Sequence, residues 1–152
     1  MRDIDHIIIH CSATREGQDF DISDIREWHK AKGWSDVGYH YVIKLDGTVQ
    51  PGRKHKTPGA HVRGYNKNSL GVCYIGGVGD DGKGKDTRTA GQKLALTGLI
   101  KYLTQQYPNA SVKGHRDFSV DLDADGIIEE HEWMKECPSF NVKNWMIEIS
   151  NL

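Results

Sequence analysis

The sequence has few cysteines and no long apolar run. Its three cysteines, Cys11, Cys73 and Cys137, are odd in number and widely separated, so we expect no disulfide framework and synthesis in a reducing compartment, the cytoplasm. No apolar run approaches the roughly 18 residues of a membrane-spanning helix, so we expect no membrane insertion. The short apolar run that ends at His10 has no cleavage site after it, so we expect no signal peptide.

The chain also lacks an excess of positive charge. Its formal net charge of -1 argues against nucleic acid as a partner, because proteins that bind phosphates usually carry a clear basic excess. Hydrophobic residues make up 37% of the chain and charged residues 27%, which is typical of a folded globular protein. We therefore expect a single domain spanning residues 1–152, and a monomer.

Strand and helix patterns alternate along the chain, which predicts an α/β fold with a mixed central sheet flanked by helices. Strands are predicted at residues 4–11, 69–78 and 110–115, with a hairpin at 38–50 that turns at Asp46-Gly47. Helices are predicted at residues 22–33, 89–106 and 142–152. The long connection at residues 51–68 is a predicted binding loop, because such loops over a rigid sheet often carry ligand-binding groups. Its candidate substrate-binding residues are His61, Tyr65 and Asn66.

Three residues at strand ends or in loops, His10, His115 and Cys137, are candidate zinc ligands. A hydrolytic zinc site needs three protein ligands and an open position for water, and imidazole and thiolate suit this ion. Their wide spacing proves little by itself, since a chain with eight histidines brings some of them together by chance.

Six segments carry a family resemblance. They are HCSAT at 10–14, GYHYVIKLDGTV at 38–49, GAH at 59–61, GYNKNSLGVCYIGG at 64–77, GHRD at 114–117 and KECPSF at 135–140. In this order they resemble the zinc N-acetylmuramoyl-L-alanine amidases, which include the amidase-type phage lysozymes and the peptidoglycan recognition proteins. The resemblance implies the fold of that family.

The resemblance also implies residue roles. His10, His115 and Cys137 match the ligands of one catalytic zinc ion, Tyr39 and Lys135 match catalytic residues, and His61 matches a histidine that contacts substrate. By pattern alone, Tyr39 is more typical of a half-buried structural tyrosine and Lys135 of a solvated helical lysine. Their catalytic roles therefore depend on the motifs. Lys135 would stabilise a developing oxyanion, and Tyr39 would orient the water or bind the same oxygen.

An acidic segment, DLDADGIIEEHE at Asp121–Glu132, interrupts the family pattern and matches an EF-hand calcium loop. The predicted calcium ligands are Asp121, Asp123, Asp125, the carbonyl of Ile127, Glu129 and Glu132. The alternative is a solvated acidic turn, but the clustered carboxylates would repel one another without a cation. We expect a structural calcium ion that orients the following segment, which carries Lys135.

The resemblance implies an enzyme that hydrolyses the amide bond between N-acetylmuramic acid and L-alanine in peptidoglycan, as an endolysin does. Such an enzyme would act on the cell wall after host lysis or specialised export. One alternative is a non-catalytic peptidoglycan-binding module, which the presence of Cys137, Tyr39 and Lys135 disfavours. Another is a protein-binding regulator, because a phage lysozyme of this kind can inhibit an RNA polymerase.

Overall fold

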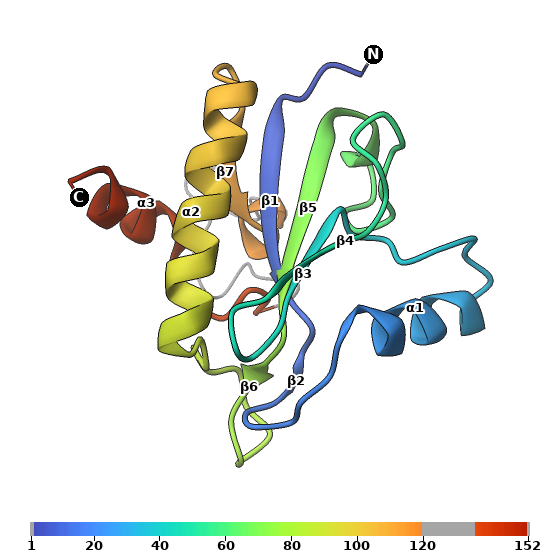
Figure 1. Ribbon diagram of the computed structural model, residues 1–152, viewed down its shortest axis with the longest axis vertical. Helices are drawn as coiled ribbons and strands as arrows, with labels where there is room; N and C mark the ends of the chain where they lie inside the picture. Colours follow the sequence, from blue (N-terminus) through green and yellow to red (C-terminus); the bar gives the residue numbers. More distant parts are fainter. Residues whose placement is uncertain (1, 120–135, 152) are drawn as a thin grey trace.

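A five-stranded sheet in the order β4-β3-β5-β1-β7 forms the centre of the computed structural model, which describes residues 2–119 and 136–151 (Figure 1). The strands are β1 (His6–Cys11), β2 (Thr14–Arg15), β3 (Tyr41–Ile43), β4 (Val49–Pro51), β5 (Ser69–Tyr74), β6 (Gly77–Val78) and β7 (Ser111–Gly114). The helices are α1 (Ile22–Ala31), α2 (Ala90–Gln106) and α3 (Val142–Ser150), with 3₁₀ turns η1 (Asn66–Asn68) and η2 (His115–Phe118). The predicted α/β architecture is confirmed.

The sheet is mixed. β1 lies between β5 and β7 and is parallel to both, and β3 is parallel to β5 but antiparallel to β4. Every residue of β5 is buried, as expected for a central strand that is covered on both faces. β2 and β6 form a separate two-stranded sheet.

The β3–β4 hairpin differs from its prediction in the turn. The backbone N–H of Lys44 donates to the carbonyl of Thr48 at 2.9 Å, so the loop consists of the three residues between them. Gly47 has φ 91°, the left-handed conformation that such loops place at their last residue. The prediction of a two-residue turn at Asp46-Gly47 is therefore wrong, because the loop also includes Leu45.

Side-chain caps mark the first turns of α1 and α2. The carboxylate of Asp21 accepts the N–H groups of Ser23 and Asp24 at the start of α1. Thr89 and Gln92 form a capping box at the start of α2. The buried apolar residues of α2 are Leu96, Leu99, Ile100 and Leu103, which recur at helical spacing. Among the residues that the structure describes, no helix is long and apolar enough to cross a membrane.

The two faces of the sheet carry separate cores. Ile7, Ile9 and Cys11 of β1 belong to the cluster that includes residues of α2 and α3, whereas the residues of α1 pack in a second cluster. α1 lies on the opposite side of the molecule from α2 and α3 (Figure 1). Because side chains alternate along a strand, His6 and His10 of β1 face away from α2. His10 therefore projects from the α1 side of the sheet, at the carboxyl end of its strand.

Candidate active site

The three candidate zinc ligands converge. One nitrogen each from His10 and His115 and the sulfur of Cys137 all lie within 4.8 Å of one another. The strand register explains the first pair: Ile9 is paired with Gly114, so the residues that follow, His10 and His115, are neighbours at the same sheet edge. Their ring centroids are 4.7 Å apart.

The donor set fits zinc. Nδ1 of His10 lies 3.8 Å from Sγ of Cys137, so this nitrogen faces the other ligands. Two imidazoles and a thiolate are ligands that zinc prefers, and three protein ligands leave a position open for water or substrate.

Backbone hydrogen bonds fix Cys137 beside β1. The N–H of Cys11 donates to Sγ of Cys137 at 3.1 Å, and the N–H of Arg116 donates to the carbonyl of Cys137 at 2.8 Å. Two effects raise the pKa of the Cys137 thiol: the larger is its hydrogen bond with the Cys11 thiol, and the second is burial. A metal ion must therefore displace a proton from this sulfur, which makes metal binding pH-dependent.

The residues after Cys137 are anchored to the central strands. The hydroxyl of Tyr74, a fully buried residue of β5, donates to the carbonyl of Pro138 at 2.5 Å. The hydroxyl of Ser139 donates to the carbonyl of Gly77 at 2.8 Å. The position of Cys137 thus depends on contacts with chain segments that are distant in sequence.

Replacement of Tyr74 by phenylalanine should destabilise this anchor. The buried carbonyl of Pro138 would lose its donor, and an unsatisfied buried polar group costs roughly 1–3 kcal/mol of unfolding free energy. Denaturant unfolding measures the loss. Tyr102→Phe is the matched control, because Tyr102 is 52% exposed on α2. Equal stabilities of the two variants would show that the Tyr74 hydroxyl contributes nothing.

Tyr39 packs against the ligand cluster. It precedes β3 rather than lying within it, and its ring centroid is 5.0 Å from that of His10. Burial, reinforced by the nearby thiols of Cys73 and Cys137, raises the pKa of Tyr39 well above its ordinary value. Its hydroxyl is therefore a protonated hydrogen-bond donor at neutral pH.

Two buried histidines support the chain on either side of Tyr39. Nδ1 of His29 accepts the N–H of Gly38 at 2.8 Å, and Nδ1 of His40 accepts the N–H of Gly71 at 3.1 Å. Burial lowers the pKa of each from 6.5 to about 4. Both imidazoles are therefore neutral at pH 7, as an accepting nitrogen requires.

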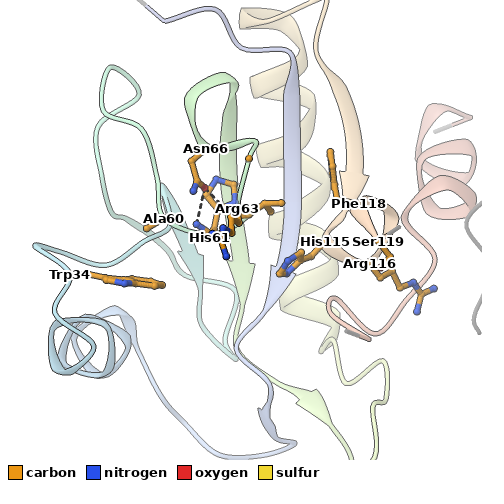
Figure 2. A pocket seen from close by; sticks show the side chains of 11 residues that line it. Trp34, Ala60, His61, Arg63, Asn66, His115, Arg116, Phe118 and Ser119 are labelled. Atoms are coloured by element: carbon orange, nitrogen blue, oxygen red, sulfur yellow. Dashed lines mark hydrogen bonds between the residues drawn. The ribbon is translucent and has the colours of Figure 1, made fainter. Parts of the chain in front are cut away.

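A cavity of about 510 Å³ opens next to the ligand cluster. The residues that line it are Trp34, Ala60, His61, Val62, Arg63, Gly64, Asn66, His115, Arg116, Phe118 and Ser119. Figure 2 shows Trp34 on one side, His115 and η2 on the other, and His61 and Asn66 between them. The cavity therefore runs between two walls, with a candidate zinc ligand on one of them.

The candidate substrate-binding residues occupy different places. His61 and Asn66 line the cavity, whereas Tyr65 packs against Phe118, a lining residue, with the ring centroids 4.5 Å apart and the ring planes inclined by 60°. The two aromatic lining residues, Trp34 and Phe118, are not among the sequence-based candidates. Phe118 directly follows the GHRD motif, but no signal in the sequence marks Trp34.

Several predicted residues lie outside the described part of the chain. They are Lys135 and the calcium-loop residues Asp121, Asp123, Asp125, Ile127, Glu129 and Glu132. Their roles stay predictions from the sequence.

Comparison with known proteins gives consistent matches. Residues 1–140 match the family described as N-acetylmuramoyl-L-alanine amidase. The endolysin of Escherichia phage T7 is 41% identical over 141 residues, which are 93% of this chain and 84% of that protein. Peptidoglycan recognition protein 1 of Bos taurus is 36% identical over 108 residues, which are 70% of this chain and 53% of that protein. The solved structure of the N-acetylmuramoyl-L-alanine amidase LysC from Clostridium intestinale has a TM-score of 0.75 and 25% identity, with 98% of this chain and 87% of that chain covered.

Proposed function

Because this chain belongs to the N-acetylmuramoyl-L-alanine amidase family and is a cell-wall hydrolase of the endolysin type, we propose that it works through a zinc ion held by His10, His115 and Cys137. The amide bond it hydrolyses joins N-acetylmuramic acid to the L-alanine of the stem peptide. We propose peptidoglycan as its partner and release from the producing cell as its route to the wall.

The convergence of the three donor atoms beside the cavity is the observation that carries this proposal. A zinc ion held there supplies a Lewis acid for the amide carbonyl and lowers the pKa of a water molecule to about 7. His115 belongs both to the ligand cluster and to the cavity lining. A stem peptide in the cavity would therefore present its amide bond beside the ligands.

Tyr39 contributes a hydrogen-bond donor to this chemistry. Its raised pKa keeps the phenol protonated, and its ring packs on that of His10 at 5.0 Å. A donor aimed at the oxygen that gains charge in the transition state is typically worth about 2.7–4 kcal/mol of barrier. We propose the same electrostatic role for the cation of Lys135, on the basis of its place in the KECPSF motif.

Product analysis on purified peptidoglycan tests the proposed reaction. An amidase liberates the amino group of L-alanine and creates no new reducing sugar ends, so end-group labelling identifies the bond that is cut. We expect new alanine N-termini, loss of activity after zinc chelation and recovery when zinc is restored. Binding to walls without new end groups on any wall chemotype would instead identify a non-catalytic binding module.

Metal content provides a second readout in the same preparation. Elemental analysis should give one zinc ion per chain. One calcium ion per chain in addition would support the loop prediction for Asp121–Glu132, and a calcium-free active protein would contradict it.

A further inference from the structure

A chain of hydrogen bonds runs behind the candidate zinc ligands. Nε2 of His10 lies 2.8 Å from Nδ1 of His61, and Nε2 of His61 lies 3.2 Å from Oγ of Ser69. His10 and Ser69 are both almost completely buried. The contact with His10 involves the ring nitrogen that does not face Cys137.

These contacts are consistent with only one arrangement of protons when a metal ion is bound. A neutral imidazole carries one N–H, and its other nitrogen has the lone pair that binds a metal ion. Nδ1 of His10 must keep its lone pair for zinc, so Nε2 carries the proton and donates to Nδ1 of His61. His61 then carries its own proton on Nε2 and donates to Ser69.

The surroundings hold the His61 ring in this position. A Cβ atom on Gly71 would lie 2.8 Å from Cγ of His61, and one on Gly59 would lie 2.5 Å from its Cδ2. Only residues without a side chain leave room for the ring at these two positions. Oδ1 of Asn66 accepts the N–H groups of both His61 and Val62 at 2.9 Å, which fixes the loop at the base of the ring.

We propose that His61 is a positioning residue for the zinc ion: it accepts the Nε2 proton of His10 and so directs the Nδ1 lone pair of His10 at the metal. This inference rests on the proposed zinc-dependent function. It gives His61 a role separate from the substrate contact expected from the sequence, although the same ring also lines the cavity. Outer-shell partners of this kind typically change metal affinity by about 10–100-fold when they are lost.

Zinc affinity and the His10 tautomer test the proposal directly. Nitrogen-15 NMR of the zinc-free protein should show the His10 proton on Nε2, and His61→Phe should remove this preference. Competition with a chromophoric chelator should show zinc binding about 10–100-fold weaker in His61→Phe. His61→Gln retains an accepting oxygen and should recover part of the affinity. His6→Phe is the control, because His6 lies on the same strand but outside the ligand cluster.

The outcomes separate this inference from the proposed function. A wild-type protein that binds no zinc would refute both. A wild-type protein that binds zinc, together with a His61→Phe variant of equal zinc affinity and unchanged His10 tautomer, would refute the positioning role alone. A raised KM with unchanged zinc affinity would likewise assign His61 to substrate contact only. If His61→Phe does not fold, Ser69→Ala replaces it and should weaken zinc binding in the same direction.

Discussion

Cys137→Ser is expected to lose zinc and to leave peptidoglycan uncut, while the protein stays folded. Serine has nearly the shape of cysteine, but its hydroxyl stays neutral and cannot replace the thiolate that this borderline-soft metal prefers. The backbone contacts that hold this residue, from Arg116 to its carbonyl and along the segment to Tyr74, are unchanged by the substitution. The loss therefore falls on metal binding rather than on the fold.

The expected loss exceeds the roughly 100-fold that is typical of outer-shell substitutions, because a direct ligand is removed. Release of alanine N-termini measures activity, elemental analysis measures zinc, and circular dichroism checks the fold. His115→Gln should behave in the same way. His6→Gln, a histidine substitution outside the ligand cluster, should keep its zinc. A zinc-loaded, active Cys137→Ser protein would exclude this cysteine as a required ligand.

Mild acid should destabilise the fold strongly through His29 and His40. Each buried imidazole accepts a backbone N–H at Nδ1, and protonation of that nitrogen breaks the hydrogen bond. Burial lowers the pKa of each group to about 4 in the folded state, whereas 6.5 applies to the unfolded chain. Between these two values the unfolded chain binds protons that the folded chain does not.

The difference between the folded and unfolded pKa values sets the direction and the size of the change in unfolding free energy with pH. The stabilisation is complete above pH 6.5, falls as the pH falls, and levels off below pH 4, the folded-state pKa. One pH unit corresponds to about 1.4 kcal/mol per group, so at pH 5 the two histidines together should cost about 4 kcal/mol of unfolding free energy. That is a large part of the roughly 5–15 kcal/mol that holds a typical domain together.

Urea unfolding at several pH values between 5 and 7 measures this effect. Asparagine places an accepting oxygen near the position of Nδ1 but does not titrate, so His29→Asn and His40→Asn isolate the proton linkage from the hydrogen bond. In each variant the unfolding free energy should fall less steeply with decreasing pH than in the wild type, by about 1 kcal/mol per pH unit averaged over pH 5 to 7. Slopes equal to that of the wild type would assign the acid sensitivity to other groups.

Local sequence signals determined the secondary structure of this protein. Asp21 and Thr89 are N-cap residues because their side chains accept N–H groups only a few positions ahead. The stripe from Leu96 to Leu103 follows from the helical repeat. These interactions join residues only a few positions apart, so they can be predicted from the sequence alone. The sequence predicted a two-residue hairpin loop where the structure has three residues. Both kinds of loop accept glycine after aspartate, and the register of β3 with β4 decides between them.

The motifs also located the candidate zinc ligands, since His10, His115 and Cys137 do come together. Only the tertiary structure decided how they are held. The register of β1 with β7 places His10 beside His115, and a hydrogen bond across 126 positions of the sequence places Cys137 beside Cys11.

The tertiary structure likewise turned His61 towards His10, a contact between residues 51 positions apart. It placed Trp34 on the cavity wall, where no sequence signal had marked it. Contacts of this kind depend on strand register and on the path of loops. Both are set by the packing of the whole chain, and no local pattern of residues encodes them.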